Sequence, residues 1–340
     1  MDFLQGRSPR TIGLASAAIT VTIWTAFIVI ARASAQGALT PFDIALARIV
    51  GASLVLVPVG VWLVRRDRAH ADGGAGRESS FWGLSPLPGS VTVQCGLFGG
   101  LAYAALAYSG FFYAPAAHAS VLLPGSLPLW TALLAALVLH DRITRARTLG
   151  LACIVAGDLL VGGASLWRAF EGGEVWKGDL LFMTAAMSWA AYSVLARRHG
   201  LDAVRATVAI TVFALFSYVP MYGLLLALGV LQSQLGSASA GEVLFQVLFQ
   251  GVGSVAISGV TFTQMIRYFG PVRSTMITAL VPGLSALGAV FFLHEPLHGN
   301  LLAGLVLVTV GILFGVRPSV AMKKRADHLA SARAKAGLDT

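Results

Sequence analysis

Charged residues are scarce in this chain of 340 residues. Asp, Glu, Lys and Arg together make up 11% of it, whereas soluble domains contain about 25%. Hydrophobic residues make up 56%, and the mean hydropathy is +0.78. One globular core cannot hide this much apolar surface from water. The composition therefore excludes a soluble protein and predicts one that lies in a lipid bilayer.

Cysteines and clustered catalytic residues are also scarce. The two cysteines, Cys95 and Cys153, both lie inside apolar stretches, so we expect small buried residues and no disulfide or metal pair. No cluster of carboxylates and histidines occurs at a common depth, which argues against a membrane-embedded enzyme and predicts no metal or cofactor. The longest polar loop, about 65–89, is shorter than a soluble domain, which argues against a scaffold or sensor.

Long apolar stretches dominate what is present. A helix needs about 20 residues to cross the ~30 Å hydrocarbon layer at ~1.5 Å per residue. We predict an all-α integral membrane protein with ten transmembrane helices, which begin near Thr11, Phe42, Val91, Ala116, Arg147, Gly178, Ala203, Leu244, Pro271 and Leu301.

The chain also contains an internal duplication. Trp24–Arg32 reads WTAFIVIAR, and Trp189–Arg197 reads WAAYSVLAR. A second series recurs in the same order: Ser120, Pro128, His140, Gly150 and Gly157 correspond to Ser274, Pro282, His294, Gly304 and Gly311. Such repetition predicts the fold before any single motif does. The expected organisation is an N-terminal segment at 1–10, a first repeat at 11–166 with a loop at about 65–89, an external linker at 167–177, a second repeat at 178–316 and a basic tail at 317–340.

Each repeat holds five predicted helices, so the two repeats must cross the membrane in opposite directions, as in many secondary transporters. The basic residues give an independent test. If the N-terminus is cytoplasmic, the 24 Lys and Arg residues all fall in cytoplasmic segments except Arg32, Arg48, Arg168 and Lys177. This bias predicts a multi-pass protein of the inner cell membrane with both termini in the cytoplasm. Topology thus explains the net charge of +9, and the dispersed basic residues form no nucleic-acid-binding face.

The segment His294–His298 matches H-E-x-x-H, the zinc-protease pattern in which two histidines one helical turn apart bind the metal. That geometry needs a continuous helix, and Pro296 cannot donate the backbone hydrogen bond that a helix requires. The corresponding segment of the first repeat, His140–Thr144, lacks the second histidine. We therefore predict a turn between helices and no metal site.

Four duplicated features, taken together, resemble the EamA-type branch of the drug/metabolite transporter (DMT) superfamily. They are Trp24 and Trp189 in the first helix of each half, the Ala116, Ser120, Pro128 and Gly270, Ser274, Pro282 series, the acidic turns at Asp141 and Glu295, and the glycine pairs Gly150, Gly157 and Gly304, Gly311. The resemblance covers about residues 10–316. It implies a secondary transporter, not an enzyme, that moves amino acids or related amphipathic metabolites outward by alternating access.

A pathway through lipid needs polar groups that face an interior cavity, because stranded polar groups are costly in hydrocarbon. The two tryptophans lie well inside their helices, where they either form a stacking wall for solutes together with nearby tyrosines or pack between helices. The prolines either free carbonyl groups for the pathway or only kink a helix. The candidate pathway residues are Trp24, Tyr103, Tyr108, Ser120, Pro128, Trp189, Tyr192, Gln264, Ser274 and Pro282.

Arg48 and Asp158 are the charged residues expected within the membrane, and Asp158 is the only carboxylate expected deep in it. An ionisable residue there is a functional hypothesis by default. Their similar predicted depths suggest an ion pair, although the fifth helix tends to be peripheral in the resembled family, which favours a structural Asp158. His118 either links transport to protons or is a neutral, hydrogen-bonded residue near the outer surface.

Small residues predict close helix packing at Gly96–Gly100 and at Gly311–Gly315, both of which have G-x-x-x-G spacing. The second pair allows a homodimer through the tenth helix. Because one chain already contains ten predicted helices, we expect a functional monomer, with the homodimer as the alternative. The expected partners are a small-molecule substrate and the lipid bilayer.

Overall fold

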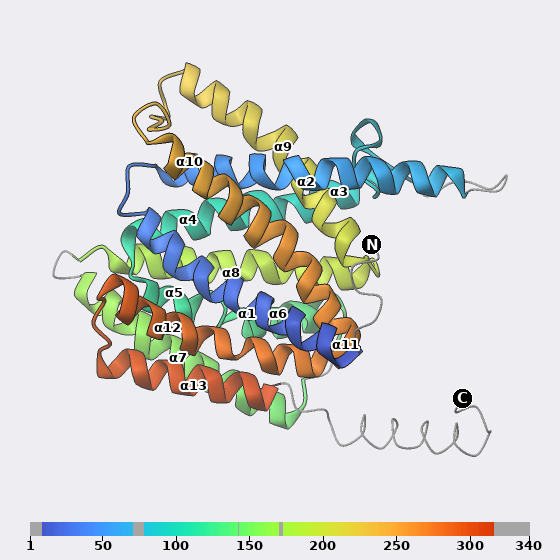
Figure 1. Ribbon diagram of the computed structural model, residues 1–340. Coiled ribbons are helices and arrows are strands. Elements are labelled where there is room, and N and C mark those ends of the chain that lie inside the picture. The colour runs from blue at the N-terminus through green and yellow to red at the C-terminus, as the bar shows by residue number, and fades with distance from the viewer. Residues whose placement is uncertain (1–8, 71–77, 142, 170–172, 316–340) are drawn as a thin grey trace, which may run out of the picture.

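The computed structural model describes residues 9–70, 78–141, 143–169 and 173–315, and almost all of this part of the chain is helical (Figure 1). The predicted tail at 317–340 and most of the segment 1–10 lie outside the described residues. In chain order the elements are α1 (Pro9–Ser34), α2 (Pro41–Ala69), η1 (Phe81–Gly83), α3 (Gly89–Gly96), η2 (Leu97–Ala102), α4 (Tyr103–Tyr113), α5 (Ala116–Leu122), α6 (Leu127–Val138), α7 (Arg145–Ala169), α8 (Val175–Arg198), α9 (Ala203–Ala227), α10 (Ala240–Gln246), η3 (Val247–Ile257), α11 (Ser258–Thr278), α12 (Leu280–Leu293) and α13 (Gly299–Gly315).

Eight apolar helices of the described chain are long enough to cross a membrane, and they coincide with the first eight predicted spans. Two further apolar helices, α12 and α13, are shorter. The 14 residues of α12 extend about 21 Å at ~1.5 Å per residue, less than the hydrocarbon thickness. The predicted start of a ninth span near Pro271 falls inside α11, which continues to Thr278. The structure therefore supports a multi-pass bundle but not ten full-length spans.

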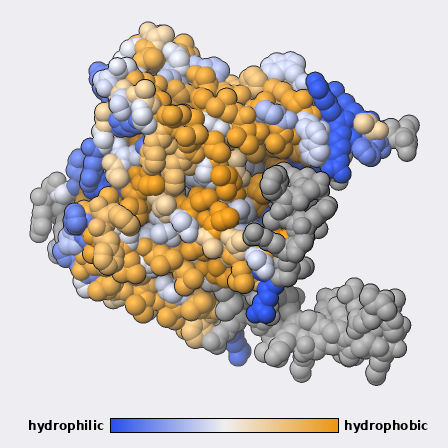
Figure 2. Space-filling view, viewed as in Figure 1, coloured by the Kyte–Doolittle hydropathy of each residue, from blue (hydrophilic) through white to orange (hydrophobic). Residues whose placement is uncertain are grey.

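The outer surface of the bundle is apolar. Figure 2 shows a mainly hydrophobic face whose hydrophilic residues gather toward two opposite sides. Large apolar side chains such as Leu54, Leu137 and Phe292 are exposed. In water such a surface would be unfavourable, whereas acyl chains solvate it readily. The surface therefore fits a bilayer around the middle of the bundle.

Contacts between the two halves occur in corresponding pairs: where a helix of the first half packs against the second half, its counterpart in the second half packs against the first. α1 packs against α11 and α12, and its counterpart α8 packs against α4 and α6. Similarly, α2 packs against η3, and its counterpart α9 packs against α3. Two further contacts, α2 with α9 and α7 with α13, join a helix directly to its own counterpart. In Figure 1, α1 and α8 run in opposite directions. This is the packing expected of an inverted duplication.

The helix connections lie at the two sides of the bundle. We call the side on which α1 begins and α13 ends the terminal side, at the right of Figure 1, and the other the opposite side. The loop predicted at 65–89 is shorter than expected, because α2 continues to Ala69. Part of it is also ordered, since the Ser80 hydroxyl donates to the carbonyl of Leu87 (2.8 Å). Arg65–Ala69 consists mainly of Arg and Ala, which have high helix propensity, and it continues α2.

The histidine-rich segment is a connection, as predicted. His294 ends α12 in the left-handed conformation (φ 54°), and residues 294–298 form no helix. Its repeat counterpart, His140, has the same conformation (φ 56°). His294 and His298 are thus not one helical turn apart on a helix, which is the geometry that the zinc motif needs.

Glycines of the duplicated pattern form the contact between α7 and α13. A Cβ added at Gly157 would lie 2.7 Å from the carbonyl oxygen of Gly304, and one added at Gly311 would lie 2.6 Å from that of Gly150. Gly96 and Gly100 pack against Phe213 and Ile210 of α9 in the same close manner. Close packing is confirmed at Gly96–Gly100, and of the second predicted pair it is seen at Gly311. Gly311 makes its contact within the chain.

Replacing Gly157 with Ala is expected to destabilise the fold by about 1–3 kcal/mol, because the new methyl group would overlap backbone atoms that cannot move aside. Gly163→Ala is the matched control in the same helix, where a Cβ meets nothing within 4 Å. The control should hold or gain stability, since Ala favours helix. The measurement is the unfolding temperature of both purified variants in detergent. Equal unfolding temperatures would contradict the packing described.

Candidate functional site

A polar cluster lies between α1, α2, α4 and η3. Arg48 Nη1 donates to Ser254 Oγ (3.1 Å) and to Tyr108 Oη (3.4 Å). The fully buried Tyr108 donates its hydroxyl hydrogen to Gln250 Oε1 (2.9 Å). The guanidinium carbon of Arg48 also lies 5.7 Å from the centre of the Phe27 ring. We call Arg48, Tyr108, Gln250 and Ser254 the central polar cluster.

The two predicted tryptophans lie in separate aromatic groups. Trp24 packs against Phe262 (ring centres 5.0 Å apart), and Trp189 packs against Tyr103 (4.9 Å) and Tyr192 (5.2 Å). Each tryptophan thus contacts the other half of the chain, and both are half-buried. The packing alternative is observed. A role in transport stays a prediction.

The predicted serines and prolines occupy matching places in the two halves. Ser120 and Ser274 are fully buried, and the Ser120 hydroxyl donates to a carbonyl one turn earlier (2.8 Å). Helix geometry is interrupted before each proline, at 123–126 and at 279. Pro128 and Pro282 therefore sit in the first turns of α6 and α12, where a missing N–H costs little. The last candidate, Gln264, is half-buried on α11.

The hypothesised pair of Arg48 and Asp158 is not formed. Arg48 is bound within the central polar cluster, as described above. Asp158 is 5% exposed, and neither of its carboxylate oxygens has a hydrogen-bond partner in the described part of the chain. Similar depth was the basis of the prediction, but depth does not fix the direction in which a side chain leaves its helix. α7 packs on α13, away from the cluster.

His118 has a carboxylate partner that the sequence analysis missed. Its Nδ1 lies 2.8 Å from Oδ1 of Asp179, which also accepts a hydrogen bond from Ser165 through Oδ2. Asp179 is 4% exposed, so Asp158 is not the only buried carboxylate. Asp179 lies in the second turn of α8. That Asp158 alone lies deep in the membrane stays a prediction, because Asp179 lies near the start of α8. The His118 environment is therefore hydrogen-bonded and close to the opposite side.

A second missed carboxylate, Asp43, ties α2 to the α9–α10 connection. It is fully buried and accepts hydrogen bonds from Tyr222 (2.5 Å), Ser233 (2.9 Å) and the backbone N–H of Gln234 (3.0 Å). It also caps α2 together with Thr40. The T-x-x-D pattern at the start of an apolar run is the sequence signal for such a cap.

Two ion pairs occupy corresponding positions at the two sides of the bundle. At the opposite side, Arg32 Nε binds Glu295 Oε1 (3.0 Å). At the terminal side, Arg197 binds Asp141 through two hydrogen bonds (2.6 and 3.1 Å). Each pair joins the first helix of one half to the acidic turn of the other half. We call them the opposite-side pair and the terminal-side pair.

The two pairs differ in burial. The Arg32 and Glu295 side chains are 19% and 10% exposed, against 60% and 28% for Arg197 and Asp141. Arg32 also donates to the carbonyl of Phe111 (2.7 Å), and Glu295 accepts from the backbone N–H of Ala117 (3.3 Å). The two halves are therefore held together more strongly at the opposite side than at the terminal side. The sequence carried the signal for both pairs, because each arginine ends a repeated segment and each carboxylate occupies the repeated turn.

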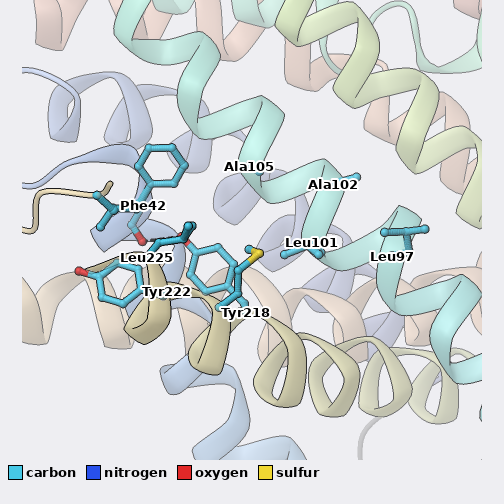
Figure 3. A pocket seen from close by; sticks show the side chains of 10 residues that line it. Phe42, Leu97, Leu101, Ala102, Ala105, Tyr218, Tyr222 and Leu225 are labelled. Atoms are coloured by element: carbon cyan, nitrogen blue, oxygen red, sulfur yellow. Dashed lines mark hydrogen bonds between the residues drawn. The ribbon is translucent and has the colours of Figure 1, made fainter. Parts of the chain in front are cut away.

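An apolar pocket of about 170 Å³ lies between the start of α2, the η2–α4 segment and α9 (Figure 3). Leu101, Tyr218 and Tyr222 are among its lining residues, and the Tyr218 hydroxyl donates to the carbonyl of Phe42 (2.8 Å). The pocket is smaller than the roughly 300–1,000 Å³ of small-molecule sites. None of the predicted pathway residues lines it. We therefore place the candidate site at the central polar cluster.

A helical membrane bundle of two oppositely directed halves, with polar groups enclosed between them, is the architecture of a secondary transporter. The model of the EamA-like transporter family matches residues 11–163 and 176–317. The chain belongs to this family, and it is a multi-pass membrane transporter of the drug/metabolite type.

Two known proteins are similar to this chain. The uncharacterized transporter YyaM of Bacillus subtilis (strain 168) is 26% identical over 231 residues, which are 65% of this chain and 71% of that protein. One crystal structure superimposes with a TM-score of 0.56 at 22% sequence identity, covering 90% of this chain and 96% of the other. At that identity the structural likeness shows the fold alone.

Asp158→Asn and Asp179→Asn are matched substitutions with opposite expected effects. Asp179→Asn removes charge-assisted hydrogen bonds to His118 and Ser165, so it should lower stability by roughly 1–3 kcal/mol. Asp158→Asn removes no hydrogen bond and is expected to be neutral or stabilising. Unfolding temperatures in detergent measure both. An equal loss for Asp158→Asn would mean that its carboxylate is paired in the folded protein.

Proposed function

We propose that the protein exports small amphipathic organic metabolites, amino acids or related compounds, by alternating access between the two sides of the membrane. Transport, and no chemical reaction, is the activity that we assign to it. The family of the chain supports transport. The enclosed central polar cluster, next to aromatic side chains, supports an amphipathic substrate.

The observation that carries the proposal is the correspondence of the two ion pairs. In an inverted repeat, one state of the protein becomes the other when the two halves exchange conformations. A contact at one side must then have a counterpart at the other side. Arg32–Glu295 and Arg197–Asp141 meet this requirement. We infer that they are the gates, and that each opens in turn.

The unequal burial of the two pairs suggests the direction of opening. The opposite-side pair is more buried and is braced by two backbone groups, whereas the terminal-side pair is a more exposed ion pair. An exposed pair contributes little stability. The terminal side would therefore open more readily from this conformation. From the distribution of Lys and Arg we further propose that the terminal side faces the cytoplasm of the cell.

We propose a functional monomer. Gly311, which begins the G-x-x-x-G pair considered for a homodimer, already packs against Gly150 inside the chain. The pathway, by this proposal, lies between the two halves and needs no second copy.

Efflux from proteoliposomes tests the proposed activity. Vesicles are loaded with a mixed metabolite extract, and the compounds that leave are identified by mass spectrometry, with and without a pH gradient. Wild-type protein should release a few amino acids or related amphipathic compounds. Trp24→Ala with Trp189→Ala should lower their release about ten-fold, if the rings contact the solute as expected from cation–π and apolar energies.

The control for that experiment replaces two exposed tryptophans, Trp62 and Trp82, with alanine. This double variant should release the same compounds at the wild-type rate. Release indistinguishable from that of empty liposomes, under every gradient, would contradict the transport proposal.

Charge exchange tests the gates. Arg32→Glu places two carboxylates together in a mostly buried site, so export should fall roughly ten-fold or more. Glu295→Arg should do the same, and the double exchange should recover much of the activity. The exposed pair Lys177–Glu174 is the control, and its exchange should change little. A double variant no better than the single ones would contradict a direct gating contact.

A further inference from the structure

Arg48 carries a charge that the described part of the structure does not neutralise. A guanidinium inside a bilayer is costly unless it is paired. Its partners, Ser254, Tyr108 and the Phe27 ring, are all neutral, and none of the ion pairs among the described residues includes it. Both of its hydrogen bonds use Nη1, so Nε and Nη2 remain available there. The side chain is only half-buried, which leaves it accessible.

Gln250 provides a second unused donor. Tyr108 Oη accepts from Arg48 and therefore donates its own hydrogen to Gln250 Oε1. With Oε1 as the acceptor, the Nε2 group of Gln250 remains as a donor. Gln250 is fully buried, and Nε2 has no hydrogen-bond partner among the described residues. An unpaired donor is costly to bury, so one that a folded protein keeps calls for an explanation such as a ligand.

The surroundings of these donors fit an amphipathic ligand. Trp24 and Phe27 are three residues apart on α1 and so lie on one face of that helix. Gln250 and Ser254 belong to η3, a stretch of π-helix, and η2 is π-helical in the corresponding third helix of the other half. Such wide turns are frequent at functional sites. Arg48 thus adjoins the Phe27 ring, and Gln250 lies on irregular backbone.

We propose that Arg48 and Gln250 bind the carboxylate of the transported substrate. A carboxylate has two coplanar oxygens that match a guanidinium, and its charge would neutralise Arg48. A cationic substrate would be repelled, and a phosphate ester, with its larger charge, would need more than one basic residue. The aromatic side chains would cover the apolar part of the molecule. This assignment rests on the proposed transport function and narrows its substrates to amphipathic organic carboxylates.

The test uses ligands with one ring and different head groups: 3-phenylpropionate, phenylalanine, 3-phenylpropionamide, 3-phenylpropylamine and phenethyl phosphate. Binding to the purified full chain is measured from the rise in unfolding temperature with ligand concentration. The wild type should bind 3-phenylpropionate roughly ten- to hundred-fold more tightly than the amide, as expected for a charge-assisted hydrogen bond. Arg48→Met should abolish this preference. Arg66→Met, an exposed arginine of the same helix, should retain it.

Gln250→Glu is the second variant, in case Arg48→Met does not fold. It introduces a carboxylate beside Arg48, which would neutralise the guanidinium and occupy the site from within the chain. The preference for 3-phenylpropionate should therefore again be lost. An unchanged preference in folded Arg48→Met or Gln250→Glu, or tighter binding of the phosphate ester, would overturn the assignment. Binding without efflux would contradict the transport proposal alone, whereas efflux that ignores the head group would contradict this site alone.

Discussion

Lipid offers no hydrogen bonds, and this constraint governs the structure. Every polar group between the two sides must find its partner inside the protein. The backbone does so through helices, and many buried hydroxyl groups do so by donating to a carbonyl one turn earlier, as Ser120 does. The buried carboxylates Asp43 and Asp179 bind four and two partner residues, respectively, near the ends of helices. A buried polar group without a partner is therefore unusual, and the central polar cluster contains such a group, Gln250 Nε2.

The duplication makes two kinds of contact possible. Where counterparts meet each other, as α7 meets α13, small residues are required on both sides, and the glycines of the repeated pattern meet that requirement. Where a helix of one half meets the other half, each contact occurs twice, once at each side. The two ion pairs are contacts of the second kind. A symmetric pair of charges at opposite sides is therefore a consequence of the fold, and the proposed gating role uses what the duplication supplies.

The sequence predicted the bundle, the repeat and the close-packing glycines, because these depend on composition and periodicity along the chain. It did not predict which side chains meet. Arg48 and Asp158 have similar predicted depths but do not meet, because the direction in which a side chain leaves its helix depends on how all helices pack. Asp179 and Asp43 were passed over because a carboxylate near a helix end is normally solvated. The lengths of α11 and α12 were also missed, since both Gly270–Pro271 and Ala279–Pro282 are plausible helix starts by local propensity.

Residues without a counterpart in the other half are candidates for substrate recognition, whereas residues with a counterpart serve the fold and the gates. A mechanism with two equivalent states needs symmetric gates and interfaces, but a substrate is not symmetric, so residues that recognise it need no counterpart. Arg48 follows this logic: α9, the counterpart of α2, has no basic residue beyond Arg205 near its start. Asp158 departs from the repeat as well, since Ile312 stands at the corresponding place of α13 and is just as buried. Asp158 lies on the interface helix α7, however, and shares no bond with the central polar cluster. Of the two unmatched charges, only Arg48 lies where the two halves enclose polar and aromatic groups together, and that placement favours it as the anchor for a substrate.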